Sequence, residues 1–473
     1  MLVGISRRLP GRESQDMILP KKKYERIHFI GIGGSGMSGI AEVILNLGFT
    51  VTGSDIAKQE TTKRLEELGA KVFYGHSPEN PVGADLVVVS SAIREDNPEL
   101  AAAREMGIPV IPRAQMLAEL MRVKFSIAVS GMHGKSTTSS MVAQVLAQAG
   151  LDPTVVIGGK FRGTRTGARL GQGPYLVAEA DESDRSFLEL FPTIAVVTNL
   201  DPEHLDTYSG MEDISEAFLR FVSRVPFYGA AVLNLDSDPV RRLMPLVERR
   251  VITYGTTRQA DVSAREVVLR DLGSDFLVFR EGEHIMDISL SVPGAHNVSN
   301  ALAVVAVALE LEIPHKEIAE GLASFSGVER RFEIKGERNG VQVVDDYGHH
   351  PTEIRATLEA ARNYWKDGRI VVLFQPHRFT RTLYLHSEFG GAFLESDLLF
   401  ILPIYPAGEQ PIEGVSSRLI YDAVKEAGHK EVHLIAEGED ALAILADVLR
   451  PGDLLLTLGA GNVWKTGEEF LNG

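Results

Sequence analysis

The stretch "SIAVSGMHGKSTTSSMVAQVL", residues Ser126 to Leu146, reads as a buried strand, a glycine turn and a helix. Gly131, Gly134, Lys135 and Ser136 form a G-x-x-G-K-S pattern in the turn. In this pattern the glycines allow close backbone approach, the lysine reaches phosphates and the serine hydroxyl binds magnesium. The free amides of the helix N-terminus then point at the phosphates. The stretch predicts a nucleotide phosphate loop; the alternative is an ordinary helix N-terminus with a surface lysine.

A second glycine-rich turn lies about ninety residues earlier, in "IHFIGIGGSGMSGIAEVIL". Gly31, Gly33 and Gly36 fit G-x-G-x-x-G, and Asp55 follows nineteen residues after Gly36. In a dinucleotide-binding enzyme these parts hold a pyrophosphate and a ribose hydroxyl. The motif does not say which diphosphate is bound, and a purely structural strand-to-helix turn is the alternative.

Composition excludes several classes of protein. The chain has 473 residues, with 48 basic and 64 acidic side chains and a net charge of −16. An acidic chain has no general attraction to nucleic acid or to an anionic membrane. Cysteine is absent, which excludes disulfides, thiolate nucleophiles and cysteine zinc sites. With no apolar run of membrane-spanning length and no signal-peptide pattern, we expect a soluble cytoplasmic protein.

The order of apolar and helix-like segments predicts an α/β fold in three domains. We expect a Rossmann-like N-terminal domain at residues 1–123 and a P-loop ATPase-like central domain at 124–326. A Rossmann-like C-terminal domain would follow at 327–473. Within the central domain, four segments between Val251 and Val292 look like a run of antiparallel strands.

Acidic and polar side chains follow two strands of the central domain, where ligands sit in open α/β sheets. They are Glu179, Asp181, Glu182 and Asp184 after one strand, and Asn199, His204 and Asp206 after the next. A carboxylate at such a strand end beside a phosphate loop commonly holds the magnesium of a bound nucleotide. Solvated acidic loops are the alternative.

Two strands of the third domain end in "VVDDYGHHPTEI" and "FQPHRFTRT". Arg378 and Arg381 in the second segment suit an acidic small molecule, because guanidinium grips carboxylates bidentately. They could also be ordinary surface arginines. The pair His349–His350 with Glu353 suggests a metal site, but consecutive side chains of an extended chain point in opposite directions, so we do not expect the two histidines to share one.

Together these segments resemble the Mur ligase family. The matching blocks fall in the family's order and cover nearly the whole chain: "GIGGSGMSGIA", "GMHGKST", "EADESDRSFL", "VVTNLDPEHLDTY", "GAHNVSNALA", "RRFE", "DDYGHHPTEI", "QPHRFTRT" and "GAGNV". The resemblance implies an ATP-dependent cytoplasmic ligase of peptidoglycan precursor synthesis. It would join L-alanine to the lactyl carboxylate of UDP-N-acetylmuramate through an acyl phosphate, with Mg²⁺, as a monomer or homodimer.

The resemblance also implies residue roles. For catalysis it implies Lys135, Glu179 and His204, and for the metal it implies Ser136, Glu179 and His204. For ATP it implies Gly131, Met132, His133, Gly134, Lys135, Ser136, Thr137, Asn297, Asn300, Arg331 and Asp346. For the UDP-sugar it implies Gly31, Gly33, Gly34, Ser35, Gly36, Met37, Ser54, Asp55 and Ser91. For the amino acid and the acyl end it implies Tyr347, His349, Arg378 and Arg381.

This sequence departs from the family's usual pattern in two places. The phosphate loop has Met132 and Ser136 where threonine is common, and serine keeps the magnesium-binding hydroxyl. Glu203 precedes His204 where the family often has aspartate, which leaves the role of that carboxylate open.

Three other functions compete with this interpretation. A dinucleotide oxidoreductase would explain the first glycine turn but not the second. A P-loop ATPase acting as a regulatory module would need no UDP-sugar. A sister ligase that attaches a preformed peptide to the same sugar would differ mainly in the third-domain pocket.

Overall fold

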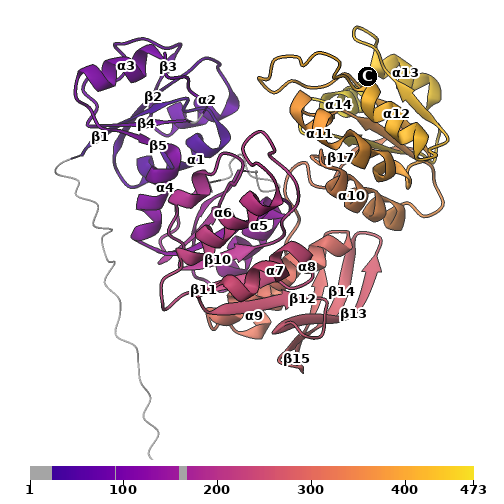
Figure 1. Cartoon of the computed structure of the whole chain (residues 1–473), viewed down its shortest axis with the longest axis horizontal. Coiled ribbons are helices and arrows are strands. Elements are labelled where there is room, and N and C mark those ends of the chain that lie inside the picture. Colours follow the sequence, from indigo (N-terminus) through magenta and orange to yellow (C-terminus); the bar gives the residue numbers. More distant parts are fainter. Residues whose placement is uncertain (1–23, 91, 159–167) are drawn as a thin grey trace, which may run out of the picture.

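A computed structural model describes residues 24–90, 92–158 and 168–473. The described chain forms three α/β units in sequence order, each built on its own sheet (Figure 1). The indigo N-terminal unit and the gold C-terminal unit lie on either side of the middle unit. None of the helices in the described ranges combines the length and apolarity that crossing a bilayer requires.

The N-terminal unit has a parallel five-stranded sheet of order β3-β2-β1-β4-β5. Its strands are β1 (Arg26–Ile30), β2 (Thr50–Asp55), β3 (Lys71–Tyr74), β4 (Leu86–Val89) and β5 (Val110–Pro112). Its helices are α1 (Ser35–Asn46), α2 (Glu60–Glu67), α3 (Pro98–Glu105) and α4 (Arg113–Arg122). The strand order reverses between β1 and β4, so the glycine turn after β1 lies at the switch point where such sheets bind ligands.

The middle unit has a ten-stranded sheet of order β15-β14-β13-β12-β11-β10-β6-β9-β7-β8. Its first strands are β6 (Phe125–Ser130), β7 (Thr154–Val156), β8 (Ala168–Arg169), β9 (Tyr175–Glu179), β10 (Ile194–Val197) and β11 (Ala230–Asn234). They are followed by β12 (Val251–Gly255), β13 (Val262–Arg270), β14 (Gly273–Arg280) and β15 (Glu283–Leu290). Strand β6, which leads into the phosphate loop, is paired on both sides in parallel with β9 and β10.

Five α-helices cover this sheet: α5 (Lys135–Gln148), α6 (Met211–Ser223), α7 (Asp238–Leu243), α8 (Ala295–Glu310) and α9 (His315–Ala323). Short 3₁₀ turns lie at Ser186–Glu189 and Met244–Leu246. Helix α8 is apolar on nearly every face and is buried against α5 and the sheet. Leu302 in its centre is fully buried, and removing such a side chain costs about 2–5 kcal/mol. The core therefore fixes α5, and with it the phosphate loop.

The expectation of four antiparallel strands between Val251 and Val292 is wrong for the first of them. Strand β12 pairs in parallel with β11 and with β13, whereas β13, β14 and β15 form antiparallel pairs. Strand β12 therefore belongs to the parallel part of the sheet, and antiparallel pairing begins between β13 and β14. The antiparallel strands extend one end of the sheet, and the turn after β13 reaches the C-terminal unit, where Asp271 pairs with Lys366.

The C-terminal unit has a six-stranded sheet of order β16-β17-β21-β18-β19-β20. Its strands are β16 (Glu333–Arg338), β17 (Val341–Asp346), β18 (Ile370–Phe374), β19 (Leu398–Ile401), β20 (Val432–Leu434) and β21 (Leu454–Leu458). Its helices are α10 (Pro351–Tyr364), α11 (Phe379–Phe389), α12 (Arg418–Glu426), α13 (Ala441–Val448) and α14 (Trp464–Asn472), with a 3₁₀ turn at Gly390–Phe393. The edge strand β16 is antiparallel to β17 and was not expected from the sequence.

Candidate active site

The phosphate loop (residues 131–134, here called the P-loop) requires glycine at both ends. Gly131 and Gly134 have φ angles of 132° and 82°, which favour glycine. A Cβ on Gly131 would lie 2.1 Å from Thr198 Oγ1, and one on Gly134 would lie 2.6 Å from Asn300 Oδ1. The loop therefore packs closely against β10 and α8, which hold its backbone in place.

Lys135 directly follows the P-loop as the first residue of α5. Its Nζ donates hydrogen bonds to the carbonyl oxygens of Gly131 (2.7 Å) and Met132 (3.1 Å) and to Glu182 Oε1 (2.7 Å). Burial opposes its charge, but Glu182 and the neighbouring carboxylates Asp181 and Glu179 raise the pKa of Lys135 above its ordinary value. The ammonium is therefore permanently charged, and it is held at the mouth of the loop.

Ser136 and Glu179 supply a pair of oxygen ligands beside that ammonium. Ser136 Oγ donates to Glu179 Oε2 at 3.0 Å, and the Gly158 amide donates to the same oxygen at 2.9 Å. Burial raises the pKa of Glu179, although Lys135 acts in the opposite direction. A hydroxyl and a carboxylate that converge in this way fit Mg²⁺, which prefers oxygen ligands. His204, the third expected ligand, lies with its Nε2 at 3.5 Å from Glu182 Oε1.

A cavity of about 460 Å³ opens beside the P-loop, between the middle and C-terminal units. Its lining includes eight residues expected for ATP: His133, Gly134, Ser136, Thr137, Asn297, Asn300, Arg331 and Asp346. Met132 is not among the lining residues, because its side chain is buried in the core. Other residues that line the cavity were not expected from the sequence, among them Asn234, Asp236, Phe325, Thr352 and Glu353. A cavity of this size can hold a nucleotide.

Asp346 ends β17 at the edge of this cavity, and its carboxylate holds the surrounding backbone. It accepts hydrogen bonds from the amides of Phe332 (2.8 Å) and Gly348 (2.7 Å) and from Thr357 Oγ1 (3.2 Å). Burial raises its pKa, although Arg331 acts to lower it. Asp346 therefore orders the chain on both sides of the cavity wall.

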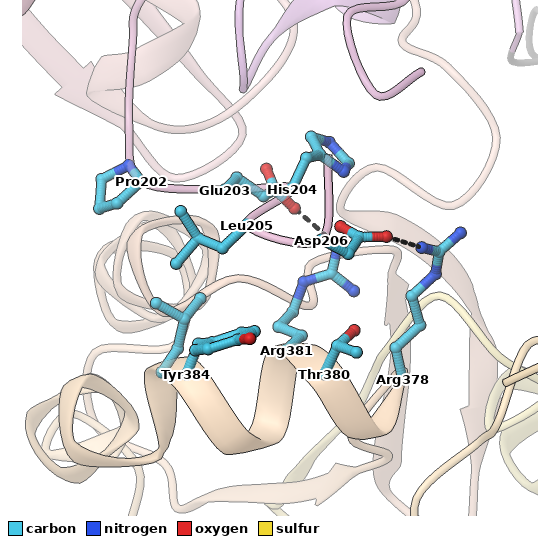
Figure 2. Close-up of a pocket in the computed structure, with 10 residues that line it drawn as sticks. Pro202, Glu203, His204, Leu205, Asp206, Arg378, Thr380, Arg381 and Tyr384 are labelled. Carbon is cyan, nitrogen blue, oxygen red and sulfur yellow. Dashed lines mark hydrogen bonds and ion pairs between the residues drawn. The ribbon is translucent and has the colours of Figure 1, made fainter. Parts of the chain in front are cut away.

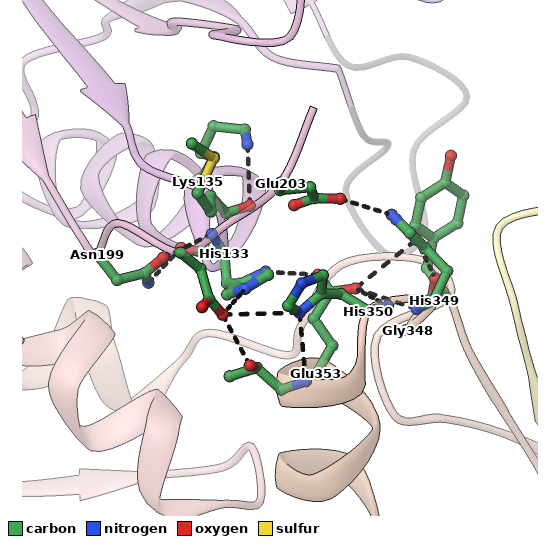
Figure 3. A network of polar contacts seen from close by, with 12 residues as sticks. His133, Lys135, Asn199, Glu203, Gly348, His349, His350 and Glu353 are labelled. Atoms are coloured by element: carbon green, nitrogen blue, oxygen red, sulfur yellow. Dashed lines mark hydrogen bonds and ion pairs between the residues drawn. The ribbon is translucent and has the colours of Figure 1, made fainter. Parts of the chain in front are cut away.

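The loop after β10 connects the P-loop to the C-terminal unit (Figure 3). Asp201 Oδ2 lies 3.0 Å from His133 Nε2 in the P-loop and accepts a 2.7 Å hydrogen bond from Thr352 Oγ1 of α10. Two residues later, Glu203 Oε1 accepts a 2.7 Å hydrogen bond from Arg381 Nη2 of α11. These contacts bring residues of two units into one site.

The histidines around this loop differ in charge. Burial opposes protonation of His133, but its hydrogen bond to Asp201 and the nearby carboxylate of Glu353 raise the pKa of His133 to about 10. Burial and the charge on His133 lower the pKa of His350 to about 4. His349 turns away from His350, with its Nε2 at 3.6 Å from Glu203 Oε1. The two consecutive histidines therefore face different carboxylates.

The arginines of the third domain line a small cavity of about 20 Å³ between α11 and residues 202–206 (Figure 2). Arg381 is bound to Glu203, and its Nη1 also donates to the His377 carbonyl oxygen at 3.0 Å. Arg378 is more exposed, and its Nη1 lies 3.4 Å from Asp206 Oδ2. The Glu203 carboxylate therefore pairs with Arg381 in this structure. Tyr347, the remaining residue expected at the acyl end, lies with its ring centroid 5.5 Å from that of His349.

In the N-terminal unit, the glycine turn is held by Asp55. Asp55 Oδ2 accepts a 2.9 Å hydrogen bond from the Gly33 amide, and its Oδ1 accepts one of 3.1 Å from the Ala57 amide. A Cβ on Gly33 would lie 2.8 Å from Asp55 Oδ2. In the described structure the Asp55 carboxylate therefore orders the turn from inside.

The other residues expected to bind the UDP-sugar are placed as follows. Gly31 has a φ of 79°, Gly34 precedes α1, and Met37 is buried in the core. Ser54 is buried, and its Oγ donates to Glu99 Oε2 at 2.9 Å. Ser35 begins α1, and Ser91 lies outside the described residues.

Arg113, the first residue of α4, was missed by the sequence analysis. Its guanidinium covers the start of α1, where a Cβ on Gly36 would lie 2.9 Å from Arg113 Nη1. Its Nη2 donates to Ser186 Oγ of the middle unit at 3.4 Å. The Arg113 cation thus lies at the N-terminus of α1, on the side of the middle unit. Such a position suits a negatively charged diphosphate. No motif points to Arg113, because it stands alone in "IPRAQML".

Three family models match the chain in succession. They are "Mur ligase family, catalytic domain" over residues 26–125, "Mur ligase middle domain" over 129–308 and "Mur ligase, glutamate ligase domain" over 330–461. Together they cover most of the chain and follow the order of its three sheets.

Curated relatives are similar over almost the full length. The UDP-N-acetylmuramate–L-alanine ligase of Geobacter sp. (strain M21) is 56% identical over 449 residues, which is 95% of this chain and 97% of that protein. The protein of the same name from Desulfosudis oleivorans is also 56% identical, over 451 residues, 95% of this chain and 99% of that protein.

Among solved structures, the UDP-N-acetylmuramate-alanine ligase of Thermotoga maritima aligns with a TM-score of 0.79 and 31% identity. The alignment covers 94% of this chain and 98% of that one. The murein peptide ligase of Psychrobacter arcticus aligns with a TM-score of 0.71 at 23% identity, over 95% of this chain and 98% of that one, which shows a shared fold.

Proposed function

Since the chain belongs to the Mur ligase family, we propose that it is an ATP-dependent ligase that joins L-alanine to the lactyl carboxylate of UDP-N-acetylmuramate. The relatives at 56% identity carry that name. On this proposal the protein acts in the cytoplasm, in peptidoglycan precursor synthesis. The first glycine turn would hold the UDP diphosphate, which is not consumed, and the P-loop would hold the ATP, which is.

The observation that carries the proposal is the loop at residues 201–206, which contacts the P-loop on one side and α11 on the other. Asp201 lies 3.0 Å from His133, and Glu203 lies 2.7 Å from Arg381. A phosphate loop and a pair of arginines on the two sides of one loop fit a reaction in which a phosphorylated acid meets an amino acid. A simple ATPase would need no such pair.

The first step is phosphoryl transfer to the sugar. An oxygen of the lactyl carboxylate attacks the γ-phosphorus of ATP, the bond to the β,γ-bridging oxygen breaks, and ADP leaves. Lys135 would stabilise the charge on the transferring phosphate, once it exchanges its contact with Glu182 for phosphate oxygens. Ser136, Glu179 and His204 would hold Mg²⁺, which neutralises phosphate charge when it is bound.

The second step forms the amide. The amine of L-alanine attacks the acyl carbon, and the tetrahedral intermediate expels inorganic phosphate and a proton. Arg378, with Tyr347 and His349, would orient the amino acid, and Arg381 would hold Glu203 beside them. Because the three orienting residues come from a different unit than Lys135, closure of the two units around the cavity would keep water from the acyl phosphate.

We propose that each of the three units binds one of the three substrates. Residues 1–123 would bind the UDP-sugar, 124–326 would bind ATP, and 327–473 would admit the amino acid. The sugar end of the substrate must reach the P-loop from the N-terminal unit. Arg113, which bridges that unit to Ser186, is suitably placed to guide it.

One experiment separates this function from its rivals. Phosphate release is measured with ATP, Mg²⁺, UDP-N-acetylmuramate and each candidate amine, and products are weighed by mass spectrometry. We expect release only when both the UDP-sugar and L-alanine are present, with a product heavier than the UDP-sugar by one alanyl residue. Release without the UDP-sugar would indicate a regulatory ATPase. Turnover only with a preformed peptide would indicate the sister ligase, and binding of NAD without response to ATP would indicate an oxidoreductase.

A further inference from the structure

Three metal-ligating side chains converge where the P-loop meets α10. His133 of the P-loop, Asp201 after β10 and His350 at the start of α10 offer ligand atoms that all lie within 4.8 Å of one another. Asp201 Oδ2 is 3.0 Å from His133 Nε2 and 3.6 Å from His350 Nδ1. Figure 3 shows the two imidazole rings facing each other, and their centroids are 4.8 Å apart.

We propose that His133, Asp201 and His350 bind one transition-metal ion of the Zn²⁺ class, which bridges the middle and C-terminal units. Two imidazoles and one carboxylate form a donor set that suits Zn²⁺, Co²⁺ or Ni²⁺. Mg²⁺ prefers an all-oxygen environment. The site is thus separate in residues and in chemistry from the Mg²⁺ ligands proposed beside Lys135.

The spacing of the three side chains is close to that of a metal site. Zinc binds imidazole nitrogen at about 2.0–2.1 Å and carboxylate oxygen at about 2.0–2.2 Å, so tetrahedral ligands lie roughly 3.3 Å apart. The two distances to Asp201 bracket that value. Small side-chain shifts would also bring the ligand nitrogens of the two histidines to this distance from each other.

The surroundings of the cluster would support the ligands from outside. Glu353 Oε1 lies 3.4 Å from His133 Nδ1, the nitrogen that does not face Asp201. Metal-bound imidazoles commonly donate their second N–H to a carboxylate, which fixes the ring and raises its basicity. Thr352 Oγ1 donates to Asp201 at 2.7 Å. His350 is fully buried, and within the described chain its Nε2 has no hydrogen-bond partner.

Charge also favours a cation at this point. The carboxylate oxygens of Asp201 and Glu353 lie 3.0 Å and 3.4 Å from the two ring nitrogens of His133. His133 and Asp201 also line the nucleotide cavity, so a bound ion would fix this wall of the cavity to α10.

The test is metal binding by the purified full chain, without nucleotide or Mg²⁺. Zn²⁺ is measured by equilibrium dialysis and Co²⁺ by its visible absorption. We expect one ion per chain and a tetrahedral Co²⁺ spectrum that Zn²⁺ abolishes. In the described structure His350 Nδ1 accepts a hydrogen bond from the Thr352 amide, which it would give up to bind the ion. His350→Asn keeps a side chain that can cap α10. It should weaken binding by more than about tenfold, the lower limit for losing even an outer partner of a metal ligand.

Two matched variants decide between this site and others. His284→Ala removes an exposed pair with Asp287 and should leave binding unchanged. His433→Ala removes an exposed pair with Glu431 and should also leave it unchanged. The proposal is overturned if no stoichiometric ion binds, if His350→Asn binds as the parent does, or if His433→Ala or His284→Ala alone loses the ion. Thermal unfolding of each variant checks that the fold is kept.

Discussion

Arg381 Nη2 and Glu203 Oε1 form a 2.7 Å ion pair between the C-terminal and middle units, and the exposed fractions of the two side chains are only 9% and 5%. Burial opposes ionisation of Glu203, but the guanidinium holds the pKa of that carboxyl well below its usual range. A buried pair of this kind is costly to break from one side. The carboxylate of a protein residue thus occupies the position that a substrate carboxylate could take beside Arg381.

This relationship separates the roles of the two arginines. We predict that Arg378→Lys raises the Michaelis constant for L-alanine by about ten- to a hundredfold. Arg378 is less tightly paired within the protein than Arg381, and lysine lacks the bidentate geometry of guanidinium. The loss of a charge-assisted pair worth about 1.5–3 kcal/mol sets that range. Steady-state kinetics should show the Michaelis constants for ATP and UDP-sugar nearly unchanged. Equal L-alanine requirements in Arg378→Lys and the parent would contradict the assignment.

Arg381→Lys is the matched comparison. Because Arg381 is committed to Glu203, its loss should lower turnover and thermal stability without a selective effect on L-alanine. A selective rise in the L-alanine requirement for this variant alone would exchange the two roles.

Lys135→Ala should abolish phosphate release and leave UDP-sugar binding intact, because the UDP-sugar is assigned to another unit. The change also leaves Glu182, a fully buried carboxylate, without its ammonium partner. That loss should cost about 3–5 kcal/mol of folding free energy. The double variant Lys135→Ala/Glu182→Gln removes the unpaired charge and should recover stability but not activity. Recovery of activity in the double variant would show that Lys135 acts only through the fold.

Arg113→Met should weaken UDP-sugar binding by roughly ten- to a hundredfold, since a charge-assisted contact to the diphosphate would be lost. Calorimetry with UDP-N-acetylmuramate measures this, and ATP binding to the same sample should be unchanged. Arg122→Met, which removes an exposed pair with Glu119, is the control. If both variants bind the UDP-sugar as the parent does, Arg113 only contacts Ser186.

His377, whose Nδ1 lies 3.2 Å from Arg381 Nη1, should remain neutral down to an unusually low pH. Burial lowers its pKa to about 3. A histidine whose folded pKa is depressed leaves stability intact above the unfolded value of about 6.5 and costs stability as pH falls from there toward 3. NMR titration of the imidazole should give a midpoint near 3, with His377→Gln identifying the signal. A midpoint near 6.5 would show that the ring is hydrated.

The parts of this site that are formed by residues adjacent in the sequence could be predicted. The strand, glycine loop and helix around Lys135 could be predicted because Gly131 and Gly134 adopt conformations that few other residues reach. The pair Glu203–Arg381 could not be, because its members are 178 residues apart and meet only when two units pack together. The hydrogen bond that Asp55 accepts from the Gly33 amide could not be predicted either, since spacing does not tell which way a strand-end carboxylate turns.

The parallel pairing of β12 could not be predicted from the sequence either. "VITYG" is an apolar strand of the same kind as those after it, and only its neighbours β11 and β13 set its direction. The edge strand β16 is similar, because its charged sequence "EIKGER" gives no clear alternation of apolar and polar residues.

The most direct test of the account follows oxygen atoms through the reaction. UDP-N-acetylmuramate labelled with ¹⁸O in both lactyl carboxylate oxygens is turned over with ATP and L-alanine, and the phosphate, the nucleotide and the product are weighed. Attack of the carboxylate on the γ-phosphorus predicts one ¹⁸O in each released phosphate, one ¹⁸O in the new amide carbonyl and none in ADP. Phosphate without the label, or label in an adenine nucleotide, would contradict an acyl phosphate formed at the P-loop.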